Sequence, residues 1–414
     1  MADDTLMPST PSTQTPNAQT PSIQTPAART EGSLAPGAAP AGSRTIRRVT
    51  GEELLTTAYP LQAYAFDATP RPAGAHDRWR KSLPYRQDNA VLVAFGDGQP
   101  EAVVVGISLR QNVRGRIVPM VGISGVATHP AARRRGHVRA LLDQLHGEMR
   151  DAGHVVSTLY PFRMSFYERF GYAGFPKPRS VRLFADGLGR MRDVDVPGEV
   201  TFHQIGDVFD DYHAFTEQLL AERHGFSVFP HHIASELGNS NDHWVAFARH
   251  EGEIVGALLY RTSGFGDELR GRHFLARGLV GRTLLLQWLA VHADQYASFT
   301  FELPPDERPD LWYVGIRYTD ETRIAAPTSS APMGRVLSLD GLAGIAAGPA
   351  QVTVEVVEDQ FVGGIWTLDG STGVLDVGAA RAPSSAPTAT LTSHGLAALV
   401  YGVLDPAEIP LLGY

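Results

Sequence analysis

A run of arginines ending in a glycine is the stretch of this sequence best suited to chemistry. Arg133, Arg134 and Arg135 precede Gly136, and apolar residues follow at helical spacing from Val138 to Met149. A loop that leads into a helix concentrates free backbone N–H groups and the positive end of the helix dipole, and a glycine lets an anion approach the backbone. The pattern predicts a pyrophosphate-binding loop. A solvated basic helix start that binds nothing is the alternative interpretation.

The elements around this loop have the order expected of a mixed α/β domain. A helix is predicted over residues 52–66, strands over 90–95, 102–109, 121–128 and 155–159, and a helix from 138 onward that Gly153 ends. The loop therefore connects a strand to a helix that precedes a further strand. Residues 45–189 are predicted to form one domain around it.

The rest of the chain divides into three further predicted ranges. Residues 1–44, rich in Pro, Thr and Ala, are expected to form a disordered tail, because they contain few large apolar side chains. Residues 190–330 repeat the order strand, turn, strand, helix, strand without a glycine loop, which predicts a degenerate second copy. Residues 331–414 contain three short β-rich runs (352–357, 364–368 and 373–377) and an apolar helix over 396–404, which predicts an α+β module.

Composition excludes several classes of function. The 414 residues include no cysteine, so a thiolate nucleophile, a disulfide and a zinc ribbon are all excluded. A formal net charge of −8 disfavours a general nucleic-acid binder. The sequence has no long apolar run and no cationic and apolar leader at its start, so we expect a cytoplasmic protein. His231 and His232 lack an H-E-x-x-H pattern, so no metal site is predicted.

Two motifs together resemble a known family. Val126-x-Thr128-x-Pro130, then R-x-x-G-x-V ending at Val138, resembles the acetyl-CoA motif of the GNAT acetyltransferases. The segment from Phe166 to Tyr172 (FYERFGY) is similar to the F-Y-x-x-F-G-Y segment that closes their active sites. The triple arginine, the second copy and the third module resemble the Eis (enhanced intracellular survival) family. That resemblance implies an α/β protein with mixed sheets, in which tandem GNAT folds precede a C-terminal α+β domain like sterol carrier protein.

The resemblance also implies roles for individual residues. The backbone of Val126, Ala127 and Thr128 would pair with the pantetheine arm of acetyl-CoA. The pyrophosphate would be wrapped by Arg134, Arg135, Gly136, His137, Val138 and Arg139, and Phe162 and Arg163 would lie beside the cofactor. Tyr167 would be the general acid, since a phenol with a pKa near ~10 can protonate the departing CoA thiolate. The alternative interpretation is that the ring of Tyr167 fills the core, which we favour for Phe166, Phe170 and Tyr172.

The base is less well defined. Enzymes of the Eis type resemble one another in using the carboxylate of the last residue, here Tyr414. The sequence ends soon after Asp405; if this carboxylate does not reach the site, water, Asp77 or Glu168 would serve instead. Glu302, Asp306 and Glu307 are interpreted as solvated carboxylates, which as a group could also attract a cationic substrate.

The resemblance predicts an N-acetyltransferase that uses acetyl-CoA and no metal. Its acceptor would be a primary amine, either on a small cationic molecule such as an aminoglycoside or a polyamine, or on a lysine side chain. Without a cysteine for an acyl-enzyme, direct transfer in a ternary complex is expected. The family resemblance implies a homohexamer, with no nucleic-acid or membrane partner. Two alternatives stay open: a tandem-GNAT aminoacyl transferase, and a non-catalytic protein that binds acyl-CoA or lipid.

Overall fold

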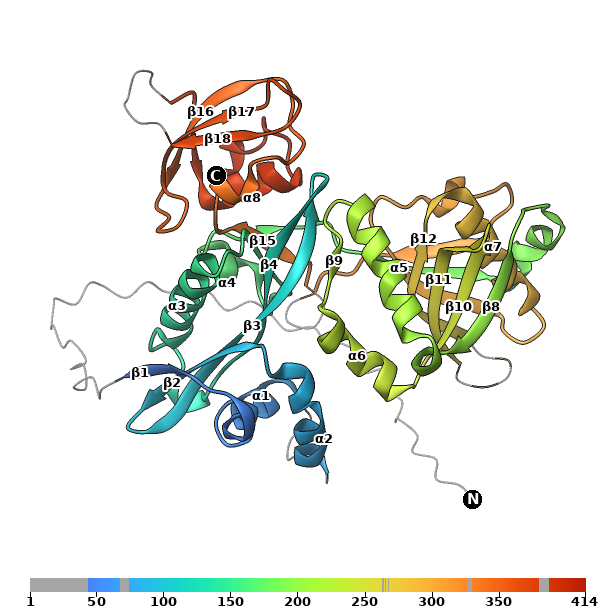
Figure 1. Cartoon of the computed structure of the whole chain (residues 1–414), viewed down its shortest axis with the longest axis horizontal. Coiled ribbons are helices and arrows are strands. Elements are labelled where there is room, and N and C mark those ends of the chain that lie inside the picture. Colours follow the sequence, from blue (N-terminus) through green and yellow to red (C-terminus); the bar gives the residue numbers. More distant parts are fainter. Residues whose placement is uncertain are drawn as a thin grey trace, which may run out of the picture. The chain divides into compact units, whose positions relative to one another are not determined.

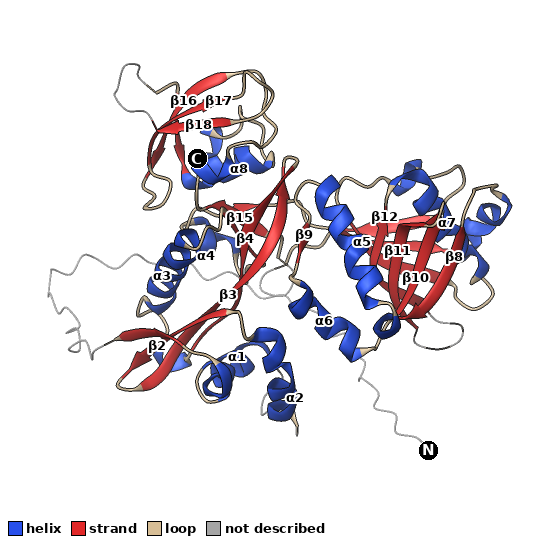
Figure 2. Ribbon diagram, in the orientation of Figure 1, coloured by secondary structure: helices blue, strands red, loops and turns tan. Residues whose placement is uncertain are grey.

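The computed structural model describes residues 44–67, 74–262, 264, 266, 268–325, 330–379 and 387–414. The predicted disordered tail lies outside these residues, apart from Arg44. Three β-sheets with helices packed against them make up the described chain (Figure 2). Within that part of the chain, no helix is long and apolar enough to cross a membrane.

The first sheet contains the predicted acetyl-CoA motif. Its strands are β1 (Thr45–Arg48), β2 (Ala90–Gly96), β3 (Gln99–Val113), β4 (Arg116–Thr128), β5 (Val156–Leu159), β6 (Ala173–Gly174), β9 (Ser227–Val228) and β15 (Met333–Val336). Their order is β1-β2-β3-β4-β5-β15-β6, with β9 paired to β3. The parallel pair β4–β5 is joined through the helix α3 (His137–Asp151), as the sequence predicts.

Helices cover both faces of this sheet (Figure 1). Along β2, Leu92 and Ala94 pack in the cluster that contains α3, whereas Val91 and Val93 pack with α1 (Ala58–Phe66), because successive strand residues point to opposite faces. The single helix predicted over 52–66 is instead a short 3₁₀ turn, Gly51–Leu55, followed by α1. The helices α2 (Ala75–Ser82) and α4 (Met164–Glu168) and the 3₁₀ turns Leu83–Arg86 and Pro130–Ala132 complete this part.

The second sheet has the order β14-β7-β13-β12-β11-β10-β8. Its strands are β7 (Arg179–Phe184), β8 (Glu199–Gln204), β10 (Trp244–His250), β11 (Glu253–Thr262), β12 (Glu268–Ala276), β13 (Ser298–Leu303) and β14 (Tyr318–Glu321). The helix α7 (Gly278–Val291) packs on one face and α5 (Phe209–Glu222) on the other, and α6 (His231–Ser240) follows β9. The predicted order of strand, turn, strand, helix and strand is confirmed here, with β12 inserted before the helix.

The third sheet has the order β18-β17-β16-β19. Its strands are β16 (Gln351–Val357), β17 (Gly364–Asp369), β18 (Asp376–Ala379) and β19 (Ala389–Thr392), and the helix α8 (Ser393–Tyr401) follows. The three predicted β-rich runs are confirmed as strands, which form the antiparallel pairs β16–β17 and β17–β18, although β18 begins three residues later than expected. The sequence did not indicate β19, which pairs in parallel with β16.

Strands cross the limits of the predicted ranges. β7, from the range 45–189, lies in the second sheet between β13 and β14. β15, from the range 331–414, lies in the first sheet between β5 and β6, and β9 joins the same sheet at β3. Pairing between strands so distant in sequence depends on which strands meet in space, and the local sequence does not encode it. The division into 45–189, 190–330 and 331–414 stays a prediction.

Candidate active site

The strands β4 and β5 separate halfway along β4. Their parallel pairing runs from Met120 opposite Val156 to Ile123 opposite Leu159, and β4 then continues to Thr128. On its other side β4 stays paired with β3, with an irregularity near Val105. Among the described residues, no strand pairs with the β5-facing edge of residues 124–128. Val126, Ala127 and Thr128 therefore line a cavity along a free strand edge, which suits an extended ligand with amide groups.

The loop after β4 delivers a helix start with free N–H groups. Arg134 (φ 66°) and Gly136 (φ 81°) both adopt left-handed backbone, and Gly136 is the N-cap of α3 without a side-chain cap. Within the described chain, no acceptor binds the N–H groups of residues 134–139. A Cβ at Gly136 would meet no atom within 4 Å, so the space in front of the helix is open. These donors and the helix dipole favour an anion here.

The arginines of the loop divide into two kinds. Arg133, Arg134 and Arg139 line the cavity and form no ion pair with a described residue. Arg135 instead lies 3.4 Å from a carboxylate oxygen of Glu101 and does not line the cavity. The local sequence RRRG cannot distinguish these cases, because Glu101 comes from the neighbouring strand β3.

His137 is buried at the start of α3. Its Nε2 lies 2.9 Å from a carboxylate oxygen of Glu101. Burial lowers the pKa of the imidazole, although Glu101 opposes this effect. Its side chain thus faces Glu101, and what it can offer an anion in front of the helix is its backbone N–H.

Tyr167 is the aromatic residue of α4 with a free hydroxyl. Its side chain is only 3% exposed, it lines the cavity, and its hydroxyl has no hydrogen-bond partner among the described residues. The ring contacts Phe162 (5.8 Å between centroids) and Phe166 (5.0 Å) edge to face. Burial raises its pKa above that of an ordinary phenol, so the hydroxyl stays protonated. Its neutral hydroxyl is able to donate a proton.

Tyr172 is a different kind of tyrosine, five residues further on. It is fully buried, and its hydroxyl lies 2.7 Å from Ser157 Oγ and 2.8 Å from His146 Nε2. Tyr172 and Phe170 belong to the core cluster around α3, and Phe166 packs against it. Tyr167 belongs to the same cluster, and Phe166 and Phe170 also line the cavity, so only Tyr172 is a core residue without a cavity-facing surface.

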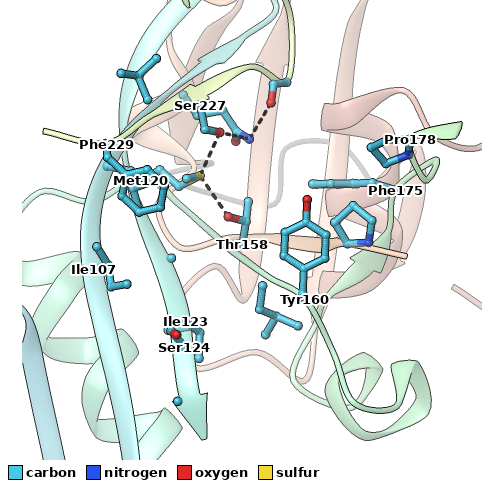
Figure 3. A pocket seen from close by; sticks show the side chains of 18 of the residues that line it. Ile107, Met120, Ile123, Ser124, Thr158, Tyr160, Phe175, Pro178, Ser227 and Phe229 are labelled. Carbon is cyan, nitrogen blue, oxygen red and sulfur yellow. Dashed lines mark hydrogen bonds between the residues drawn. The ribbon is translucent and has the colours of Figure 1, made fainter. Parts of the chain in front are cut away.

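The cavity extends well beyond the predicted motif, to about 2460 Å³. Figure 3 shows Tyr160, Phe175 and Pro178 on one side of a part of it, facing Ile107, Met120 and Phe229. Thr158 and Ser227 both donate hydrogen bonds to the sulfur of Met120. Sequence reasoning missed these wall residues, because they come from β3, β5, β9 and the segment before β7.

Glu302, on β13, also lines the cavity. Its side chain is exposed and forms no ion pair or hydrogen bond with the described residues. Tyr160 lies within its electrostatic reach: although its side chain is 75% exposed, the protein atoms around its hydroxyl first, and then the charge of Glu302, raise the pKa of Tyr160. An unpaired carboxylate beside an aromatic ring is a suitable partner for an ammonium group.

Two other predicted residues lie outside the cavity lining. Arg163 is exposed at the N-cap of α4. Tyr414 donates a hydrogen bond from its hydroxyl to Glu168 (2.9 Å) and stacks on His394, with 3.8 Å between ring centroids. The structure thus brings together Val126, Ala127, Thr128, Arg134, Gly136, His137, Val138, Arg139, Phe162 and Tyr167, and leaves Arg135, Arg163 and Tyr414 aside. No cluster of potential metal ligands exists among the residues that the structure describes.

Comparisons with known proteins agree with this geometry. Residues 45–174 match the family model described as an acetyltransferase (GNAT) domain. Over 125 residues the chain is 40% identical to the N-acetyltransferase Eis of Mycobacterium tuberculosis (strain H37Ra) and of Mycobacterium bovis (strain BCG Pasteur). This alignment covers 29% of the chain and 30% of each of these curated relatives.

The likeness of fold covers much more of the chain. The crystal structure of Eis1 from Mycobacterium abscessus superposes with a TM-score of 0.70 at 16% identity, covering 89% of this chain and 92% of that one. A GCN5-related N-acetyltransferase from Kribbella flavida gives 0.71 at 21% identity, covering 90% and 92%. At such identities the likeness concerns the fold alone.

Residues 45–174 match a domain of the GNAT acetyltransferase class, whose domains use acetyl-CoA as co-substrate. Within that class, the aligned part of the chain is similar to the Eis N-acetyltransferases.

Proposed function

We propose that this protein is an acetyl-CoA-dependent N-acetyltransferase that transfers acetyl to a primary amine of a cationic acceptor. The observation that carries the proposal is the composition of one cavity wall. A free strand edge, an uncapped helix start with three unpaired arginines, and the hydroxyl of Tyr167 all line the same cavity. The first two suit the arm and the pyrophosphate of acetyl-CoA, and the third suits the departing sulfur.

In this proposal each cofactor-binding residue acts through a defined group. Val126, Ala127 and Thr128 offer backbone groups to the pantetheine amides. The N–H groups of residues 134–139 and the side chains of Arg134 and Arg139 hold the pyrophosphate. Arg135 and His137 contribute backbone N–H groups only, because their side chains face Glu101. Phe162 contributes apolar surface, and Arg163 is close to the cofactor only if the segment before α4 moves.

The reaction balances without an acyl-enzyme. The neutral amine attacks the thioester carbon, and the C–S bond of the tetrahedral intermediate breaks. The leaving thiolate takes the hydroxyl proton of Tyr167, and the phenolate is reprotonated from solvent. The chain contains no cysteine, so direct transfer in a ternary complex is the mechanism that we propose.

The acceptor side is electrostatically suited to a cation. Glu302 offers an unpaired carboxylate, and Tyr160 and Phe175 offer aromatic surface in the same cavity. A polyamine, an aminoglycoside or a lysine side chain presents the required positive charge. If Glu302 binds it, Glu302→Gln should raise KM for the amine about 5- to 10-fold, as expected for one cation–carboxylate contact. The KM for acetyl-CoA should not change.

The proton of the attacking amine needs an acceptor. A base role for the Tyr414 carboxylate requires the terminal residue to turn from its contact with Glu168 toward the cavity. Water in the cavity needs no such change. Appending residues to Tyr414 tests the first of these: loss of turnover supports the carboxylate, and unchanged turnover leaves water, Asp77 or Glu168 as the base.

The family resemblance extends the proposal to assembly and location. It implies a sterol-carrier-like C-terminal domain over residues 331–414, a homohexamer and a cytoplasmic location. Sedimentation equilibrium of the full chain would test the hexamer directly, because a monomer has a mass of 44.7 kDa.

The deciding experiment is thiol release from acetyl-CoA by untagged protein, with a panel of polyamines, aminoglycosides and lysine peptides. We expect release that depends on the amine, with the acetylated amine confirmed by mass spectrometry. Tight acetyl-CoA binding without release from any amine would contradict the proposal and favour a protein that only binds acyl-CoA.

A further inference from the structure

The turn that follows Tyr167 is held by residues more than 150 positions away. The N–H groups of Phe170 and Tyr172 both donate to the carbonyl of Tyr167, at 2.9 and 3.4 Å. The turn from Phe170 to Tyr172 thus fixes the end of α4, and any group that holds this turn also holds Tyr167.

Arg335 holds the turn from β15. Its Nη1 donates to the carbonyl of Phe170 at 2.5 Å, and its Nη2 pairs with Asp359 at 2.8 Å. The side chains of Arg335 and Asp359 are only 4% and 6% exposed. The guanidinium also lies over the rings of Tyr172 (5.9 Å) and Phe361 (5.3 Å), so it has little freedom to move.

Asp359 is itself fixed in the loop between β16 and β17. Its Oδ1 accepts hydrogen bonds from the N–H groups of Phe361 (2.8 Å) and Val362 (3.0 Å). Its other oxygen is therefore presented to Arg335 by a loop that is already closed. A chain of direct contacts runs from the third sheet through Arg335 to the carbonyl of Phe170.

Two further contacts bring the same C-terminal segment against α4. Gly171 has left-handed backbone (φ 78°), and a Cβ there would lie 2.4 Å from Ser393 Oγ, at the start of α8. Glu168 accepts a hydrogen bond from the hydroxyl of Tyr414. The C-terminal segment thus contacts the residues on both sides of the Tyr167 turn.

We propose that Arg335 and Asp359 are positioning residues for Tyr167, so that the C-terminal segment sets the direction of the catalytic hydroxyl without contributing a reacting group. A buried ion pair is a weak source of stability, because desolvation offsets much of its attraction. What such a pair provides is a defined geometry. Proton transfer requires that geometry, since a displacement of about 1 Å can lower a rate on the order of 100-fold. This inference rests on the proposed function.

The test is a double-mutant cycle between Arg335 and Tyr167. Arg335→Met should lower kcat about tenfold or more, with KM for acetyl-CoA changed less than about twofold. In the Tyr167→Phe background the same change should have almost no further effect on kcat, because the group being positioned is gone. An equal loss of kcat in both backgrounds would overturn the proposal.

Folding needs its own control, because Arg335→Met leaves the Asp359 carboxylate buried without a partner. Arg335→Met with Asp359→Asn removes both charges and keeps an acceptor for Phe361 and Val362. It should recover thermal stability but not kcat. Arg116→Met is the matched control: Arg116 also donates to backbone carbonyls of the C-terminal segment, Gly341 and Ala343, far along the sequence from α4. It should leave kcat within about twofold.

Hydrogen exchange distinguishes failure of this proposal from failure of the proposed function, because it requires no turnover. The amides of Phe170, Gly171 and Tyr172 should exchange faster in Arg335→Met than in Arg116→Met, with α3 unchanged. Unchanged exchange at these amides would overturn the positioning role whatever the activity of the protein. Faster exchange in Arg335→Met, found together with a wild-type protein that shows no amine-dependent release, would support the positioning role and contradict the proposed function instead.

Discussion

The first and second sheets each contain a connection from a strand to a helix at the same place in the fold, but the two connections differ. Eight residues separate β4 from α3, 129 to 136, and they form the open arginine loop. Only Arg277 separates β12 from α7. Its N–H donates to the carbonyl of Val255 at 2.8 Å, and its guanidinium binds Glu222 and Gln218. The second helix start thus has no loop to surround an anion, and its arginine is already paired.

The gap between the two central strands also differs. In the first sheet it is part of the cavity. In the second sheet β12 and β13 separate after Arg270, and rings contact one another beyond that point. Phe274 stacks on Phe301 (4.7 Å between centroids) and on Trp312 (5.6 Å), and all three are buried. In the first sheet the gap stays part of the cavity, and in the second it is filled by the core. The fold thus provides a cleft, whereas loop length and side-chain volume decide whether the cleft stays open.

Residues that fill the gap between β12 and β13 should contribute more to the free energy of unfolding than residues that line the gap between β4 and β5. Phe301→Ala should lower the free energy of unfolding by about 3–5 kcal/mol, because a buried ring is lost and a cavity is left. The counterpart in the open gap, Val126→Ala, should cost only about 1 kcal/mol. Urea unfolding of both variants measures the difference. Similar losses would mean that the two gaps are equally packed, which would break the comparison.

Substitutions beside the gap between β4 and β5 should lower kcat more than substitutions in the core of the second sheet. Tyr167→Phe should lower kcat about 10²- to 10³-fold with little change in KM for acetyl-CoA, since only the proton donor is removed. The matched control is Tyr296→Phe: Tyr296 is buried in the core that packs on the second sheet, and this variant should retain activity. Steady-state thiol release gives both values. A Tyr167→Phe protein with full kcat would return Tyr167 to the core interpretation.

The two helix starts should differ in affinity for acetyl-CoA. Arg134→Ala combined with Gly136→Asp should weaken binding about 30- to 100-fold, because a charge-assisted contact is lost and a negative charge is placed before the helix. Arg277→Ala, at the corresponding connection of the second sheet, should leave affinity unchanged. Calorimetric titration with acetyl-CoA is the measurement. If the wild type, the double variant and Arg277→Ala bound acetyl-CoA with equal affinity, the arginine loop would not be part of the binding site.

A histidine of the second sheet should make stability depend on pH. His273 Nδ1 lies 2.6 Å from the hydroxyl of Tyr212, and burial, aided by Arg272, lowers its pKa to about 4. The unfolded chain binds this proton near pH ~6.5, so the stability is complete above that pH and declines as pH falls toward 4. In His273→Phe, the free energy of unfolding should fall less between pH 7 and 4.5 than in the wild type, by on the order of 1 kcal/mol. His231 is exposed, so His231→Gln is the control. The measurement is the midpoint of urea unfolding at pH 7 and at pH 4.5. Parallel losses in all three proteins would assign the acid sensitivity to other groups.

Local sequence was sufficient for the features that depend on local spacing. The apolar residues of α3 repeat with the helical period, the glycine before the helix permits close approach to the backbone, and Phe166 to Tyr172 form a compact aromatic turn. Each of these patterns acts within about ten residues, so it is visible without a fold. For the same reason the strand, loop and helix that carry the arginines were predicted in the right order.

Tertiary structure decided which of these residues face the cavity. Arg134 and Arg135 are neighbours with identical side chains, and only the position of Glu101 on β3 separates a free arginine from a paired one. Glu302, Tyr160 and Phe175 come together from three segments, and Arg335 reaches Phe170 from across the chain. Likewise, the contact of Tyr414 with Glu168 could not be read from the last residues alone. The sequence by itself determined the strand–loop–helix unit and its chemistry, because propensity and spacing are local. The lining of the cavity and the support of Tyr167 depend on strands distant in sequence, which only the folded chain brings side by side.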